Sequence, residues 1–372
     1  MNISSLSTPC LLLEKKTLDA NVRRMLARAD ETGIAIRPHL KTAKSAAIAE
    51  LATGSKRFGI TVSTLLEAEY FAKHGFDDIT YAVGIVPSKL DRAAKLMNDG
   101  VDLKIIADNE DVVTAIARHG AAFKVLLEID CGDNRAGIPA ESQMLESVAS
   151  SLLSEATDAR LIGVLTHAGH SYGVEDRAAI ARIGEEERAA VVHAAGRLTA
   201  AGHQISVVSA GSTPTALFME HTDGLTELRA GVYVFFDLDQ QSRGVCETDE
   251  IALSVLASVI GHNRSAGKLL LDCGGLALSK DLGANAFRPE VGYGVVCDFK
   301  TGKPYDGAYV SSVSQEHGHV KVDDEALYEY LPVGSLVRVL PNHACMTAAA
   351  YDRYFVVDSG NVIAEWDRVN GW

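Results

Sequence analysis

The feature that most constrains the fold is a regular alternation, starting at residue 17, of amphipathic stretches and short runs rich in apolar and β-branched residues. The stretches have helical periodicity and several end at glycine, whereas the runs have the length of buried strands. Strands that alternate with helices form parallel sheets, because each helix returns the chain to the start of the next strand. The runs expected to be strands cover residues 35–41, 57–63, 78–83, 102–108, 123–130, 160–167, 206–211 and 226–233.

Eight strand–helix units are the number that closes a parallel (β/α)8 barrel. An open, doubly wound sheet stays an alternative, because the order of strands in a sheet cannot be read from one sequence. The segment after the seventh strand, STPTALFMEHTDG, has the weakest helical pattern of the seven that join the strands. We therefore predict an α/β fold whose barrel occupies residues 17–245.

The pattern changes after residue 245, where strand-like runs follow one another without long helices. Such runs predict an antiparallel β domain, which we place at residues 246–372. The stretch TPCLLLE near the N-terminus is a further candidate strand that could join either domain, so residues 1–16 are left open. The runs are IALSVLASVIGH, GKLLLDCGG, AYVSSVSQEHGHVKV, SLVRVLPNHACMT, RYFVVD and VIAEWDRV.

Charge and composition exclude several classes of function. A formal net charge of −14 repels a phosphate backbone, so nucleic acid is not expected as a partner. The first residues lack the pattern of a signal peptide, and no apolar run approaches the roughly 18 residues that cross a bilayer. We expect a soluble, cytoplasmic protein whose six scattered cysteines are reduced.

Polar residues gather where the predicted strands end. In a barrel of this kind, the loops at the carboxyl ends of the strands converge on one open face and carry the chemistry. Any one of these residues could be an ordinary polar loop residue, but together they favour a functional site on that face. They are Lys41 after the first strand, Arg135 after the fifth, His167 and Tyr172 after the sixth, Ser212 and Thr213 after the seventh, and Gly231 and Tyr233 at the eighth.

The last two of these segments suit a phosphate group. GST and AGVY supply glycines for close backbone approach, together with hydroxyl groups, and barrels often bind phosphate between strands seven and eight. A phosphate site opposite a lysine suggests pyridoxal 5'-phosphate, which is held by its phosphate and joined to a lysine as an imine.

Lys41 is the candidate lysine, within the stretch RPHLKTAKS. A lysine becomes nucleophilic when desolvation and nearby cations disfavour its charged form, and Arg37 and His39 are candidates for those cations. The alternative is that Lys41 extends to solvent while Arg37 forms an ion pair.

The stretch LPNHACMT carries a second chemical signal. His343 and Cys345 are two residues apart in a predicted strand or at its end, so in an extended chain their side chains lie on the same face. Imidazole with thiolate favours zinc over harder ions, and two protein ligands would leave the ion open to substrate. The alternative is a buried thiol beside an ordinary histidine.

Several motifs together resemble the fold-type III pyridoxal-phosphate enzymes of the D-serine dehydratase and metal-activated D-threonine aldolase group. The resemblance extends over nearly the whole chain and implies an alanine-racemase-like barrel, a C-terminal β domain and a homodimer. The motifs are RPHLKTAKS, GITVSTLLEAE, THAGHSY, VSAGSTPT, RAGVYVFFD, SQEHGHV and LPNHACMT.

The resemblance also implies roles for single residues. Lys41 would hold the cofactor as a Schiff base and then act at the α carbon, and His343 and Cys345 would hold zinc, with manganese or magnesium as other candidate ions. Around the cofactor, the resemblance places Arg135 at the phenolic oxygen, His167 at the ring, Arg229 at the pyridine nitrogen, and Ser212, Thr213, Gly231 and Tyr233 at the phosphate. It places Tyr172, Glu316 and His317 near substrate or metal, and Tyr172 also beside the cofactor. Tyr172 and His317 are the further catalytic candidates.

The activity implied is dehydration of a D-β-hydroxy amino acid, such as D-serine or D-threo-3-hydroxyaspartate, to a 2-oxo acid and ammonia. Three alternatives remain. A metal-activated aldolase would cleave the same substrates to glycine and an aldehyde, and a racemase would not need the histidine–cysteine pair. A pyridoxal-phosphate carrier without activity would be a single barrel, which the β domain argues against.

Overall fold

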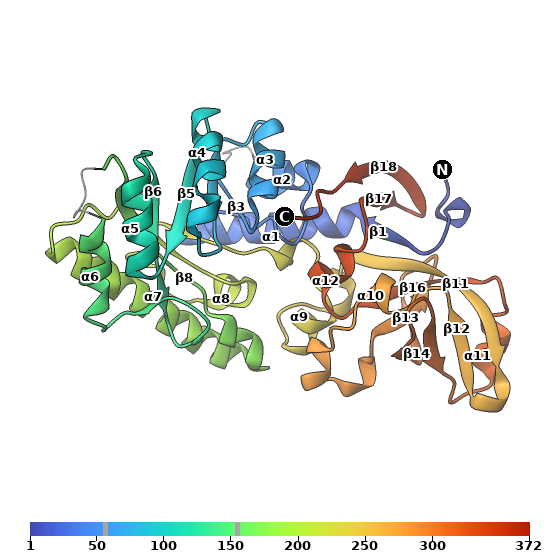
Figure 1. Ribbon diagram of the computed structural model, residues 1–372. Coiled ribbons are helices and arrows are strands. Elements are labelled where there is room, and N and C mark those ends of the chain that lie inside the picture. The colour runs from blue at the N-terminus through green and yellow to red at the C-terminus, as the bar shows by residue number, and fades with distance from the viewer. Residues whose placement is uncertain (55–58, 153–156) are drawn as a thin grey trace. The chain divides into compact units, whose positions relative to one another are not determined.

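The computed structural model describes residues 1–54, 59–152 and 157–372 (Figure 1). The chain divides into two compact units. The β unit comprises Met1–Arg23 and Val232–Asn370, and the barrel unit comprises Arg24–Gly231 and Gly371–Trp372. The proposed domain limits at residues 17–245 and 246–372 stay a prediction. No helix in the described ranges is long and apolar enough to cross a membrane.

The barrel unit is built on eight parallel strands, counted over the described residues, and each lies within one of the predicted runs. Residues 57 and 58 of the second run lie outside the described residues. In sheet order the strands are β2 (Ala35–Ile36), β10 (Glu227–Leu228), β9 (Val207–Ala210), β8 (Arg160–Thr166), β6 (Lys124–Asp130), β5 (Asp102–Ala107), β4 (Asp78–Tyr81) and β3 (Ile60–Val62). A two-residue strand, β7 (Ile138–Pro139), pairs with the end of β6.

The two ends of this sheet meet, which closes the barrel. His39 and Thr61 form a parallel bridge, and the Leu40 amide donates to the Thr61 carbonyl at 2.8 Å. The Thr61 amide in turn donates to the Pro38 carbonyl at 2.9 Å. The closed (β/α)8 barrel is therefore confirmed, and the open sheet is excluded.

Helices join the strands where the sequence predicts them, and side chains cap the starts of α3, α5, α7 and α8. Thr64, Asn109, Asp176 and Ser212 each accept a hydrogen bond from a backbone N–H in the first turn. The predicted weakness after the seventh strand is confirmed, since α8 has six residues. The connecting helices are α2 (Ala46–Thr53), α3 (Leu65–Lys73), α4 (Leu90–Asn98), α5 (Glu110–His119), α6 (Met144–Ser151), α7 (Arg177–Ala200) and α8 (Thr213–Phe218), and α1 (Lys15–Thr32) precedes β2.

Ion pairs fill the barrel near the amino-terminal ends of its strands. The Arg37 guanidinium donates to Glu227 at 2.7 Å and to Asp78 at 2.8 Å, and Asp78 also accepts from Lys104 at 2.7 Å. Asp78 and Glu227 are the first residues of β4 and β10. Gly59 leaves room for this network, because a Cβ there would lie 1.9 Å from an Arg37 guanidinium nitrogen. The pairing compensates the cost of burying the arginine.

The β unit contains a closed antiparallel barrel of six strands with three more strands at one side. In ring order the six are β12 (Lys268–Leu271), β15 (Gly318–Lys321), β14 (Pro304–Val313), β13 (Gly294–Asp298), β16 (Leu336–Pro341) and β11 (Leu253–Asn263), and β12 pairs again with β11. The added strands are β1 (Cys10–Glu14), β17 (Arg353–Asp358) and β18 (Asn361–Asp367).

The antiparallel character of this unit is confirmed, and the open question about TPCLLLE is answered. β1 pairs antiparallel with β11 and parallel with β17, so it belongs to the β unit. Its leucines are fully buried. The sequence analysis missed β13, whose run GVVCD is short and lies between glycine-rich turns. The unit also contains the short helices α9 (Leu238–Ser242), α10 (Gly275–Leu278), α11 (Ala326–Tyr330) and α12 (Ala344–Ala348).

Removing one partner of the buried ion pairs should destabilise the barrel. Arg37→Met leaves the Glu227 carboxylate buried without its cation, so the free energy of unfolding should fall by about 3–5 kcal/mol. Urea unfolding followed by circular dichroism measures this change. Lys95→Met is the matched control, because it removes an ion pair with Asp99 whose two side chains are exposed. Equal effects of the two substitutions would contradict the role given to the network.

Candidate active site

The barrel unit brings most of the predicted site residues to one rim, at the carboxyl ends of its strands. His167 is the centre of this group, because its electrostatic environment includes Lys41, Arg135 and Arg229. The His167 ring lies 6.3 Å from the Tyr172 ring, and its Nδ1 atom lies 3.3 Å from the Gly211 carbonyl oxygen. Residues from the loops after β2, β6, β8, β9 and β10 therefore meet at one face.

Lys41 lies just beyond β2 with an exposed side chain. Arg37 and His39, which were expected to act on Lys41 as cations, do not have that role. Arg37 is neutralised by Glu227 and Asp78, as the alternative interpretation of Lys41 and Arg37 supposed. Burial, with the charges of Lys41 and Arg229, lowers the pKa of His39 well below its usual value, so His39 is uncharged at neutral pH. The cations whose charges act on His167 at this rim are Lys41, Arg135 and Arg229.

The loops expected to hold a phosphate are tightly built. Gly211 has a φ of 118°, and a Cβ there would lie 2.7 Å from the Arg229 carbonyl oxygen. A Cβ on Gly231 would lie 2.6 Å from the His39 carbonyl oxygen. Both positions therefore require glycine. Ser212 caps α8 and its hydroxyl lies 3.0 Å from that of Ser171.

The other two residues assigned to the phosphate differ in position. Thr213 follows Ser212 as the first residue of α8 and is buried. Tyr233 follows Gly231 by two residues but belongs to the β unit. It is buried, and burial raises the pKa of its hydroxyl. The assignment of both to the phosphate stays a prediction.

Two arginines of the rim have different surroundings. Arg135 is 57% exposed, with its guanidinium 3.9 Å from Glu128 and 3.9 Å from Asp133, so it can still bind an anion closely. Arg229 is buried and points into the barrel, where it donates to the Ser209 hydroxyl and the Thr166 carbonyl. Two of its nitrogen atoms are thus already engaged.

In the β unit, His343 and Cys345 meet, although not in the way expected. The extended geometry assigned to both residues was wrong for Cys345, because β16 ends at Pro341 and α12 begins at Ala344. His343 is the extended N-cap residue of this helix and Cys345 lies in its first turn. The thiol still reaches the imidazole and acts on its pKa.

Carboxylates surround this pair. The His343 Nδ1 atom lies 2.7 Å from an Asp281 carboxylate oxygen. Asp237 accepts the Ala344 amide at 2.8 Å, and burial and Asp239 raise its pKa to about 7. Burial alone would lower the pKa of His343, but Asp281, Cys345 and Asp237 raise it to about 11. A field that favours the imidazolium so strongly also favours a metal cation.

The donor set fits a metal ion with two protein ligands. Because Asp281 engages Nδ1, the Nε2 atom of His343 is the nitrogen that would coordinate a metal ion once it loses its proton. Over the ranges that the structure describes, no group of three or more His, Cys, Asp or Glu side chains is arranged as a metal site. Sequence reasoning missed Asp281 because it lies about sixty residues before His343, on a loop without a motif.

Glu316 and His317 lie on the turn between β14 and β15, where both are exposed. This turn packs closely against the chain at Gly274, because a Cβ there would lie 2.5 Å from the His317 amide nitrogen. Their expected place near substrate or metal stays a prediction.

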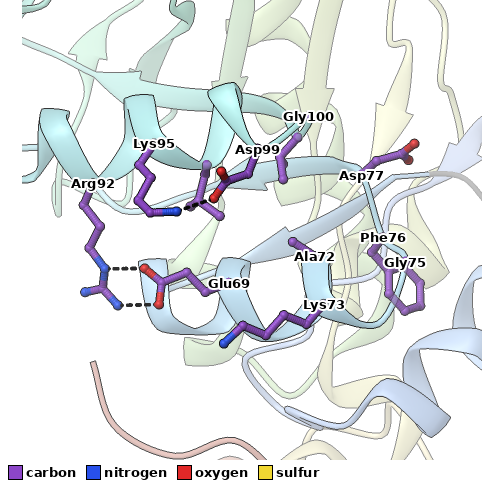
Figure 2. Close-up of a pocket in the computed structure, with 12 residues that line it drawn as sticks. Glu69, Ala72, Lys73, Gly75, Phe76, Asp77, Arg92, Lys95, Asp99 and Gly100 are labelled. Carbon is purple, nitrogen blue, oxygen red and sulfur yellow. Dashed lines mark hydrogen bonds and ion pairs between the residues drawn. The ribbon is translucent and has the colours of Figure 1, made fainter.

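A pocket of about 620 Å³ lies elsewhere on the barrel unit, between α3 and α4 (Figure 2). Its lining includes Asp77 and Val101, which directly precede β4 and β5. Arg92 and Glu69 form a two-pronged ion pair in its wall. This end of a barrel contributes stability rather than chemistry, so the pocket is not the candidate active site.

The neutral histidines give the rim a testable pH response. Burial, followed by the charges of Lys41 and Arg135, lowers the pKa of His167 to about 3. His167 and His39 should therefore show no titration between about pH 5 and 8 in the protein without cofactor. Nuclear magnetic resonance of ¹⁵N-histidine-labelled protein, assigned with His167→Asn and His39→Asn, measures this, and the urea-unfolded chain is the control.

The same shift makes folding sensitive to acid. An unfolded chain binds a proton at position 167 below about pH 6.5, whereas the folded chain does so only near pH 3. Stability should thus fall as the pH falls through this window, by at most about 1.4 kcal/mol per pH unit. His167→Asn should flatten the dependence. An unchanged slope would contradict the assignment of a neutral His167.

Comparison with known proteins agrees with this organisation. Residues 13–239 match the family described as "Alanine racemase, N-terminal domain", and residues 252–357 match the "Putative serine dehydratase domain". The two matches correspond to the parallel barrel and the antiparallel unit. The expected alanine-racemase-like fold is thereby confirmed.

Several curated proteins are similar over their whole length. D-threo-3-hydroxyaspartate dehydratase of Delftia sp. (strain HT23) is 42% identical, with 99% of this chain and 98% of the relative covered. Its solved structure matches this chain with a TM-score of 0.95 at 41% identity, and both chains are covered completely. A cysteine-to-alanine variant of D-threo-3-hydroxyaspartate dehydratase, solved in the metal-free form, matches with a TM-score of 0.95 at 40% identity and the same coverage.

Two more distant relatives are also similar along the full chain. D-serine dehydratase of Dictyostelium discoideum is 30% identical, with 97% of this chain and 96% of the relative covered. 3-Hydroxy-D-aspartate aldolase of Paracoccus denitrificans (strain Pd 1222) is 29% identical, with 98% and 92% covered. The chain therefore belongs to the D-serine dehydratase family, and it combines an alanine-racemase-type barrel with a serine dehydratase domain.

Proposed function

We propose that the protein is a lyase that dehydrates D-β-hydroxy amino acids, with D-threo-3-hydroxyaspartate and D-serine as the substrate class, to a 2-oxo acid and ammonia. The observation that carries this proposal is the full-length similarity to a D-threo-3-hydroxyaspartate dehydratase, which exceeds the similarity to the aldolase. The exposed Lys41 amine at the rim of the barrel unit supports it.

The rim of the barrel unit fits pyridoxal 5'-phosphate. Lys41 would hold its aldehyde carbon, and Ser212, Thr213 and the glycine-lined backbone at Gly211 and Gly231 would hold its phosphate. When bound, this cofactor accepts the electron pair that a substrate leaves behind when it loses its α proton. A Cβ at either glycine would collide with the neighbouring backbone, at Arg229 or at His39, so a larger residue would force these loops apart.

The chain's own residues would bind the substrate and move its protons. The Lys41 amine is the base that takes the α proton, since it is the exposed amine of the rim. The neutral His167 holds its orientation through its contact with the Gly211 carbonyl and adds no positive charge. Arg135 and Tyr172 would bind anionic or polar groups of substrate and cofactor, and Arg135 has the exposure for this.

In the β unit, His343 Nε2 and Cys345 Sγ would hold zinc, which imidazole and thiolate favour over manganese or magnesium. A zinc ion there would polarise the β-hydroxyl so that it leaves as hydroxide. Asp281 holds the imidazole from behind through Nδ1. The metal-free form of a similar dehydratase supports a metal site in this family. The homodimer and the cytoplasmic location stay predictions.

Product analysis tests the function. The protein, with and without zinc, is incubated with D-serine, D-threonine and each configuration of 3-hydroxyaspartate. We expect ammonia with an oxo acid, loss of turnover on chelation, and loss of a borohydride-trapped cofactor in Lys41→Ala. Glycine with an aldehyde would show the aldolase instead, whose relatives also match the full chain. Bound cofactor with no turnover of any substrate would favour a carrier.

Asp281 gives a separate prediction about the metal. Asp281→Asn weakens the hold on the Nδ1 proton of His343, and loss of such a partner typically costs 10–100-fold in metal affinity. Zinc retained after dialysis against a competing chelator measures this without any assay of turnover. Asp323→Asn, which removes an exposed carboxylate of the same unit, is the control. Equal retention in both variants would contradict the role of Asp281.

A further inference from the structure

A glutamate on α7 is fully buried inside the barrel unit. Glu187 is 0% exposed, and one oxygen of its carboxyl group, Oε1, accepts two backbone hydrogen bonds. The donors are the amides of Ala168 and Gly211, each at 2.9 Å. Buried carboxyl groups are costly unless hydrogen bonds or charges compensate them, so this one is held in place by specific partners.

The two donors belong to different loops of the rim. Ala168 directly follows His167, and Gly211 directly precedes Ser212. The Gly211 carbonyl also faces the Nδ1 atom of His167 at 3.3 Å, so the two loops are joined from both sides. A single side chain therefore links the histidine loop to the loop expected to hold the phosphate.

The helix is shaped to bring Glu187 to this place. Gly184, one turn earlier on the same face, lets α7 approach α8, since a Cβ there would lie 3.3 Å from the Cβ of Met219. The Thr215 hydroxyl, which belongs to the capping box of α8, lies close enough to act on the carboxyl. Burial raises the pKa of Glu187 while Thr215 and the two amides lower it.

We propose that Glu187 is a positioning residue, which fixes the main chain at Ala168 and Gly211 so that His167 and Ser212 face the same phosphorylated cofactor. The proposal rests on the proposed function. Because its side chain is fully buried, Glu187 would act through the two loops and not by direct contact with cofactor or substrate. Its loss should weaken binding of the phosphate-bearing ligand first, because the phosphate loop loses its anchor.

The test measures ligand binding by the full-length protein freed of cofactor. Equilibrium dialysis gives the dissociation constants for pyridoxal 5'-phosphate and for pyridoxal, which lacks the phosphate. Glu187→Met, which cannot accept the two amides, should weaken binding of the phosphate form about tenfold or more and that of pyridoxal far less. Glu187→Gln keeps an acceptor oxygen and should restore most of the affinity. Glu186→Gln, an exposed neighbour on α7, is the control.

Hydrogen exchange adds a readout that a general loss of stability would not give. In Glu187→Met the amides at Ala168 and Gly211 should exchange faster while the rest of α7 keeps its protection. If the methionine variant does not fold, Glu187→Asp carries the test, because its carboxylate is one methylene too short for both donors. A folded variant, methionine or aspartate, with unchanged affinity would overturn the proposal. Failure of the unsubstituted protein to bind the cofactor would instead overturn the proposed function.

Discussion

The closure of the parallel barrel is the constraint on which the rest of the structure depends. Two backbone hydrogen bonds between Pro38–Leu40 and Thr61 join the first strand to the second. Because all strands of the ring run in the same direction, their carboxyl ends lie at one face, and Lys41 leaves the first strand at that face. In an open sheet, β2 and β3 would lie at opposite edges, and the loops that follow them would be far apart. The meeting of Lys41 with His167 and Arg229 is thus a result of topology.

The barrel also separates charge along its axis. Near the amino-terminal ends of the strands, Arg37 and Lys104 are paired with carboxylates, so their charges are satisfied locally. Near the carboxyl ends, the imidazoles are kept neutral by burial and by neighbouring cations. The first arrangement stabilises the fold, whereas the second keeps a positive rim available to an anionic ligand. In the β unit the sign is opposite, and carboxylates create a site that favours a cation.

The sequence predicted the architecture because the pattern of apolar residues differs between helices and strands, and the folded elements follow that pattern. All eight strands of the barrel lie within the predicted runs, and the weak helix after the seventh strand is α8. The errors lie where local pattern and tertiary contact differ. Arg37 was expected to act on Lys41, but partners far along the chain, Asp78 and Glu227, determine its place. Asp281 carries no motif at all.

The geometry of His343 and Cys345 shows a second limit. Spacing predicted their proximity, but only coordinates reveal the turn from strand to helix between them. Glu187 had a detectable signal. It occupies a position in the buried stripe of α7 that also contains Ile180, Gly184 and Val191, where an apolar residue is the rule. A glutamate in such a stripe indicates a buried partner, although the sequence does not show which loops it binds.

The position of β1 has a consequence for biosynthesis. Leu12 pairs with Ser254, which lies 242 positions later in the sequence. The ribosome must therefore add 242 residues after Leu12 before this pairing partner has been synthesised. At about 5–20 residues per second, a ribosome needs roughly 12–50 s for that length. During this interval Leu11, Leu12 and Leu13 have no neighbouring strand of the β unit to pair with, while the residues of the barrel are being synthesised. This apolar amino-terminal strand can therefore take its place in the β unit only during the last third of translation.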